Sequence, residues 1–406
     1  MSILERKDIG TTLILVEKII RSVAGLYVFS YFTRKLPIAV FAELMYLLSI
    51  SSLISAIVAA GLPSLSLSLQ QKFRSNRIVI SYIWWIILFN TISILAISYL
   101  LLQYLNLKLE LLIIILSPTW FLAVNQILEH RYYLSNKTKE IAWASIIALI
   151  ISSCVKVITV RFTDHIGIIC FTFIFDPLII FISLSVRFVI IPKRPSLNKI
   201  RYFLRRSLPL LLASMATILY TKTDVIMLKK FMTETDVALY AVAVRVVESF
   251  YILCVVLVTS RYGRIMGMQT IDKAELRRLL VVFLILFVIL IISLQLFMPY
   301  VINFVFGESY IKSINIIIPL SYNIIFVFMG ILVTNLLITQ HLEYTILYSQ
   351  VLASIINVSI NFLLIPKYGV EGAVFGSIVA QFVSSIGFFA AYSPSRRALI
   401  AIYQNV

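Results

Sequence analysis

Charged residues are scarce in this chain of 406 residues. Asp, Glu, Lys and Arg together make up 13%, whereas hydrophobic residues make up 61%. A soluble domain carries about 25% charged and about 45–50% apolar residues. The composition therefore excludes an ordinary soluble globular protein and predicts a polytopic membrane protein.

Cysteine and histidine are also rare, and no familiar catalytic motif is present. The chain holds Cys154, Cys170, Cys254, His130, His165 and His341. The cysteines fall inside hydrophobic stretches and the histidines stand alone near their ends, so neither a disulfide framework nor a metal site is expected. No Walker, HExxH, CxxC, GxSxG or Rossmann sequence occurs. We therefore expect no enzyme, no cofactor and no metal.

Apolar runs of about 20 residues, long enough for a membrane-spanning helix, recur along the chain. The predicted spans are 9–32, 37–61, 78–103, 110–128, 141–160, 166–186, 207–228, 237–260, 279–301, 313–339, 344–365 and 371–392. The predicted fold is therefore an all-α polytopic membrane protein with twelve transmembrane helices. We expect them to form two six-helix bundles around a central cavity.

Lys and Arg are concentrated in alternate connections between these spans. The most basic ones are 187–206 and 261–278, followed by 61–78 and 129–140. Basic loops stay in the cytoplasm, which predicts that both termini are cytoplasmic. The net charge of +17 is then explained by this bias and by contact with anionic membrane lipids, and no nucleic-acid partner is needed.

The connection near the midpoint divides the chain into two similar halves. Residues 1–187 are predicted to form an N-terminal six-helix bundle, and 207–406 a C-terminal one. The basic linker 188–206 includes Asn198–Arg206, which is expected to form an interfacial amphipathic helix. Paired repeats of this kind are common in secondary transporters.

Several charged residues lie within the predicted spans. The basic ones are Lys18, Arg21, Lys156, Lys222 and Arg245. The acidic ones at comparable depth are Glu17, Glu43, Asp176, Asp224 and Glu248. A charge at the bilayer centre costs roughly 2.5–3.5 kcal/mol even on the lenient insertion scale, so each of these needs a partner or a function.

Spacing along the helix separates these residues. Glu17 precedes Arg21 by four positions, so the two can pair on one helix face. Arg245 and Glu248, three positions apart, can do the same. Lys18 has no such partner on its own helix.

Lys222 and Asp224 cannot pair with each other in this way. Lys222 and Asp224 are two positions apart and point to different sides of their helix, so each is expected to pair with another helix.

Two interpretations of these charges remain open. In the first, Lys18, Arg21, Lys222 and Arg245 line a cationic cavity that attracts an anionic, phosphate-bearing substrate. The carboxylates Glu17, Asp176, Asp224 and Glu248 are then candidates for ion coupling or for charge pairing. In the second interpretation, all of these residues form structural salt bridges between helices.

Sequence stretches in both halves resemble a known family. The first half contains FTRKLPIAVFAELMYLLSIS followed by AAGLPSLSLSL, and the second contains RRSLPLLLASMATILYTKTDVIMLKKF and NVSINFLLIPKYGVEGAVFGSIVAQ. The matching positions are Ser207, Leu208, Pro209, Asp224, Tyr240, Arg245, Gly307, Tyr310, Asn357, Asn361, Pro366, Gly369, Gly372 and Ala373. In this order they resemble the Wzx-type O-antigen and polysaccharide repeat-unit flippases, within the multidrug/oligosaccharidyl-lipid/polysaccharide exporter superfamily.

The resemblance implies a substrate and a location. It implies that undecaprenyl-pyrophosphate-linked O-antigen units move from the cytoplasmic to the periplasmic leaflet of the bacterial inner membrane, by alternating access coupled to an ion. It also admits an O-antigen polymerase and a chain-length regulator as partners. Alternatives are an exporter of capsule, exopolysaccharide or teichuronic-acid units, a multidrug exporter, and a membrane-embedded polymerase or acyltransferase.

Overall fold

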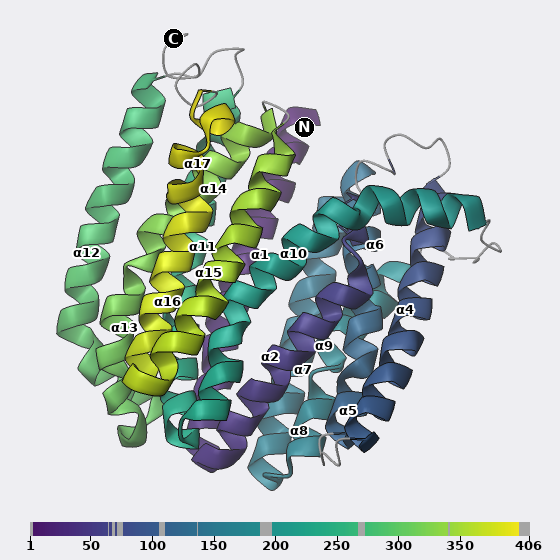
Figure 1. The fold of residues 1–406 in the computed structure, drawn as a ribbon. Coiled ribbons are helices and arrows are strands. Elements are labelled where there is room, and N and C mark those ends of the chain that lie inside the picture. Colours follow the sequence, from purple (N-terminus) through teal and green to yellow (C-terminus); the bar gives the residue numbers. More distant parts are fainter. Residues whose placement is uncertain are drawn as a thin grey trace. The chain divides into compact units, whose positions relative to one another are not determined.

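The computed structural model describes residues 3–63, 65–66, 70, 76–104, 110–135, 137–186, 197–266, 273–339 and 342–397 (Figure 1). These residues contain helices and no β-strand. The helices of the first half are α1 (Ile3–Lys35), α2 (Ile38–Ala59), α4 (Asn76–Tyr104), α5 (Glu110–Phe121), α6 (Asn125–Leu134), α7 (Thr138–Phe162), α8 (Ile166–Thr172) and α9 (Phe175–Ser185). Those of the second half are α10 (Leu197–Phe231), α11 (Glu234–Met266), α12 (Lys273–Phe306), α13 (Ile314–Ser321), α14 (Asn323–Thr339), α15 (Glu343–Tyr368), α16 (Val370–Phe382) and α17 (Phe388–Ala391).

Most predicted spans correspond to one long apolar helix or to two consecutive shorter ones. Ten segments of the described chain are long and apolar enough to cross a membrane. The predicted fourth span is built from α5, a 3-10 turn at Leu122–Val124 and the start of α6. The first predicted span lies within α1, which carries Glu17, Lys18 and Arg21 near its middle and is not among these ten segments. The prediction of an all-α polytopic membrane protein is confirmed.

The chain divides into two compact units, Met1–Ile218 and Leu219–Val406, which we call the N unit and the C unit. Helix α10 runs through the boundary. Of the predicted linker, residues 188–196 lie outside the described part, and 197–206 form the first turns of α10. The predicted division at 187 and 207 stays a prediction.

The N unit is built around a core that α2, α4, α5 and α6 share. Its buried residues include Val58, Ile83, Trp120 and Ile127. The indole nitrogen of Trp120 donates a hydrogen bond of 2.8 Å to the hydroxyl of Ser51, so this large side chain is buried without an unpaired polar atom. Helix α1 packs along α7, and α7 packs along α9. This places the charged middle of α1 beside α7 and α9.

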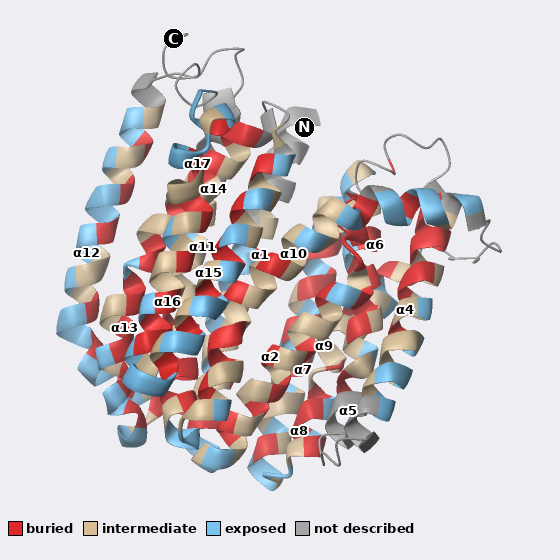
Figure 2. Cartoon of the chain, viewed as in Figure 1, coloured by how far each residue is buried: buried red, intermediate tan, exposed pale blue. Residues whose placement is uncertain are grey.

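The C unit depends on close contact between α15 and α16. A side chain at Gly372 would meet the backbone of Leu364 at 2.7 Å, and one at Gly376 would collide with the Asn361 amide. These two glycines therefore permit the close packing of α16 against α15. Exposed residues are frequent on the outer face of α12 (Figure 2), as expected for a helix that contacts lipid.

Candidate functional site

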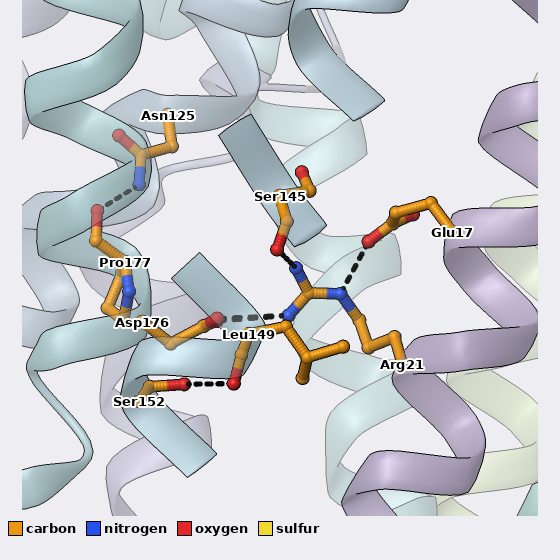
Figure 3. Close-up of polar contacts among 8 residues, drawn as sticks. All are labelled: Glu17, Arg21, Asn125, Ser145, Leu149, Ser152, Asp176 and Pro177. Carbon is orange, nitrogen blue, oxygen red and sulfur yellow. Dashed lines mark hydrogen bonds and ion pairs between the residues drawn. The ribbon is translucent and has the colours of Figure 1, made fainter. Parts of the chain in front are cut away.

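Arg21 is the centre of a polar network in the N unit (Figure 3). Its Nε donates to Glu17 Oε1 at 2.7 Å, and its Nη1 donates to Asp176 Oδ2 at 3.0 Å. Its Nη2 donates to the backbone carbonyl of Ser145 at 3.3 Å. The guanidinium thus joins α1 to α7 and α9. The predicted pairing of Glu17 with Arg21 is confirmed, and Asp176 is a second partner.

An interrupted helix positions Asp176. Helix α8 ends at Thr172 and α9 begins at Phe175, so Asp176 lies in the first turn of α9, where a carboxylate is favoured by the helix dipole. Pro177 follows directly and is tolerated there because the first turn of a helix needs few N–H donors. The amide of Asn125 donates to the Pro177 carbonyl at 2.7 Å (Figure 3). The helix is therefore interrupted just before the Asp-Pro dipeptide.

Lys18 differs from Arg21 although it is only three residues away. Its side chain is exposed, and the described residues provide it with no ion pair. It interacts electrostatically with Glu129 of α6, as Glu17 and Arg21 also do. Glu129 was missed by the sequence interpretation because it lies one residue beyond the predicted span 110–128. The continuation of α6 to Leu134 brings it into the site.

A second polar cluster surrounds Asp224 in the C unit. Its carboxylate is buried, with 2% exposure. It accepts hydrogen bonds from the hydroxyl of Tyr240 at 2.6 Å, from the Asn361 amide at 2.5 Å and from the Ser377 hydroxyl. Asn361 also donates to Asn357 Oδ1 at 3.0 Å.

The members of this cluster come from α10, α11, α15 and α16. Asp224 contacts other helices, as predicted, but its hydrogen-bond partners are neutral. Two motif asparagines, Asn357 and Asn361, thus belong to this cluster in addition to their role in packing. Sequence spacing could not show this, because more than a hundred positions separate Asp224 from them.

The three remaining cations of the predicted spans are Lys222, Arg245 and Lys156. Lys222 Nζ is 3.4 Å from Glu248 Oε1 on α11, which confirms that Lys222 pairs with another helix. Arg245 is half-buried, and its predicted pairing with Glu248 stays a prediction. Lys156 Nζ lies 4.5 Å from the centre of the Phe173 ring, close enough for a cation–π interaction.

The predicted site residues are therefore divided between the two units. The N unit brings together Glu17, Arg21 and Asp176, with Lys18 beside them. The C unit holds Lys222, Asp224, Arg245 and Glu248. The assignment of the cations to substrate and of the carboxylates to coupling stays a prediction.

Known proteins of the same fold are transporters and flippases. The lipid II flippase MurJ, in its inward closed conformation, matches with a TM-score of 0.78 and 15% identity, covering 99% of this chain and 92% of that one. An inward-facing multidrug resistance MATE transporter of the MOP superfamily matches with a TM-score of 0.69 and 15% identity, covering 95% and 96%. A MATE protein in the straight conformation gives 0.63 at 13% identity, covering 98% and 96%. These likenesses show a shared fold.

Comparison with curated protein sequences gives no match. The family model described as "Polysaccharide biosynthesis protein" matches residues 9–262, which contain the whole Arg21 network and the Asp224–Tyr240 pair. The chain is therefore a multi-pass membrane protein that belongs to this polysaccharide biosynthesis family.

Proposed function

We propose that this protein is a flippase for lipid-linked oligosaccharides whose sugar is attached through pyrophosphate. Its substrate is an undecaprenyl-pyrophosphate-linked O-antigen repeat unit, which it moves from the cytoplasmic to the periplasmic leaflet of the bacterial inner membrane. Membership of the polysaccharide biosynthesis family supports this proposal, as does a fold shared with a lipid II flippase.

One observation carries the substrate assignment: Lys18 is an exposed cation in the middle of α1, the helix that contains the first predicted span. Arg21, one turn away, is already balanced by Glu17 and Asp176. Lys18 interacts with the Glu129 carboxylate without forming an ion pair to it, and a cation at this depth costs roughly 2.5–3.5 kcal/mol, which an anionic ligand would offset. A pyrophosphate carries the charge and the acceptor oxygens that an ammonium group binds. Lys18 therefore contacts the substrate, and Arg21 holds α1, α7 and α9 in position around it.

Asp224 is our candidate for ion coupling. It is buried among neutral donors, and the Asn361 Oδ1 atom in the same cluster is buried without a hydrogen-bond partner. An isolated carboxylate in such surroundings is strongly stabilised by a bound cation or a proton. Binding and release of that cation would alter the packing of α10 against α11, α15 and α16. In this way the ion gradient would supply the free energy for an alternating-access cycle.

The test of this function is genetic complementation in a strain that lacks its own repeat-unit flippase. We expect Lys18→Ala to lower surface glycan display while the protein remains at normal abundance in the membrane. Lys18→Arg should keep most of the activity, because it keeps the charge. Lys139→Ala is the matched control, since Lys139 is an exposed lysine of the same unit outside the predicted spans. Normal glycan display in the Lys18→Ala strain would contradict the assignment.

Two related functions share part of this support. Capsule, exopolysaccharide and teichuronic-acid units are alternative cargoes, and strains deficient in each pathway would distinguish them by which defect the gene corrects.

A multidrug exporter is the alternative that the MATE-like fold supports. Cells that express the protein should then gain resistance to cationic dyes, and we expect none. An O-antigen polymerase and a chain-length regulator remain proposed partners.

A further inference from the structure

The first turns of α10 have two unlike faces. One face is packed into the N unit: Phe203 is 2% exposed, and its ring lies 5.8 Å from that of Tyr82 on α4. The opposite face exposes Arg201 and Arg205, one turn apart, together with the apolar side chains of Leu204 and Leu208. This combination of exposed arginine and exposed leucine is typical of a helix that lies at a membrane surface.

The placement of this segment agrees with such a role. The first part of α10 runs across the end of α4 instead of alongside it, and the helix then changes direction (Figure 1). Pro209 lies inside α10 and explains a bend, because its ring removes a backbone hydrogen bond to Arg205.

The segment is also firmly anchored. A side chain at Gly61, in the turn after α2, would collide with the backbone of Ser207 and Leu211. This contact holds the first turns of α10 against the N unit, so their outer face has a fixed orientation.

The connection that leads into α10 in the sequence is rich in Lys and Arg. The sequence contains no Asp or Glu between Asp176 and Asp224, and none between Glu43 and Glu110. The connections 61–78 and 187–206 are thus basic without an acidic residue, whereas the stretch from α6 to the start of α7 carries Glu129 and Glu140. Within the described chain, Arg201 and Arg205 have no acidic partner. An anionic ligand from outside the protein can therefore bind both arginines.

We propose that the outer face of α10, defined by Arg201, Leu204, Arg205 and Leu208, is a binding surface for anionic phospholipid head groups. The two guanidinium groups bind the phosphate groups, and the two leucines enter the boundary between head groups and acyl chains. This surface is distinct from the Lys18–Arg21 site, and the proposal does not depend on what the protein transports. Transport would then respond to the anionic lipid content of the membrane.

Native mass spectrometry of the full-length protein in detergent tests this surface. The wild type should retain phosphatidylglycerol in preference to phosphatidylcholine. The double variant Arg201→Gln/Arg205→Gln should bind phosphatidylglycerol about 30-fold more weakly at low ionic strength, given the usual contribution of two basic residues near an anionic surface. Equal binding by wild type and double variant would overturn the proposal.

Controls separate lost charge from lost folding. Arg201→Lys/Arg205→Lys should keep the preference for phosphatidylglycerol. Lys312→Gln/Lys367→Gln removes the same charge from two exposed residues of the C unit and should leave binding unchanged. If inorganic pyrophosphate at equal concentration displaces phosphatidylglycerol completely and binds with the same dependence on the two arginines, the surface serves a soluble phosphate, and the lipid proposal is wrong.

Discussion

Arg21 and Lys18 show how two cations on one helix can have different roles. Each nitrogen of the Arg21 guanidinium has an acceptor, and the three acceptors lie on α1, α7 and α9. A lysine at position 21 would be a single donor group on a flexible chain and could not reach all three. We therefore propose that Arg21 has a structural role in the site and that Lys18 is the cation available to a ligand.

We predict that Arg21→Lys destabilises the protein by about 1.5 kcal/mol, the lower end of the range for hydrogen bonds to charged groups, because the side chain is partly exposed. Thermal unfolding in detergent, followed by tryptophan fluorescence, measures this. Lys18→Met is the comparison and should not lower the unfolding temperature, because it removes a charge without breaking an ion pair. The same unfolding temperature for wild type and Arg21→Lys would show that the network contributes nothing to stability.

For Asp224, the question is whether its buried carboxylate serves folding or transport. We expect Asp224→Asn to impair transport more than folding, because the amide has a similar volume and the hydroxyls of Tyr240 and Ser377 can rotate to accept a hydrogen bond. Immunoblotting of membranes and glycan display together measure both effects. Absence of the variant from the membrane fraction would assign Asp224 a structural role instead.

At the scale of the element, the contact between α15 and α16 limits what position 372 can hold. Gly372→Ala would place a methyl group 2.7 Å from the Leu364 backbone, so one helix has to shift. We predict a loss of about 1–3 kcal/mol of stability, the usual effect of overpacking. Size-exclusion chromatography of a fluorescent fusion, after heating, gives the measurement. Gly330→Ala on α14, where the nearest side-chain atom would be 3.2 Å away, should be milder, and equal effects would contradict this account.

At the scale of the whole molecule, the uneven distribution of Lys and Arg predicts the orientation in the membrane. With both termini in the cytoplasm, alkaline phosphatase fused after Arg397 should be inactive, and a fluorescent protein fused there should be bright. Fusions in the connection at 229–236 should give the reverse result. A phosphatase-positive C-terminal fusion would invert the topology and would place the basic surface of α10 on the periplasmic side.

The sequence by itself determined the class of this protein and the approximate extent of its helices. The length of an apolar run and the scarcity of charged residues in it are local properties of the sequence. They can be recognised without knowing which helices contact each other. The same holds for the pairing of Glu17 with Arg21, which needs only the geometry of one helix.

Only the tertiary structure decided which distant residues share a site. Asp176 reaches Arg21 because α1, α7 and α9 pack together, and Glu129 joins them through an extended α6. Asp224 meets Asn361 and Ser377 because Gly372 and Gly376 let α16 approach α15 closely. Such contacts join positions that are far apart in the chain, and no periodicity within one helix encodes them. This is why the sequence predicted intramembrane charges in need of partners, and the packing of the helices decided which of them, such as Lys18, lacks an ion-pair partner within the described chain.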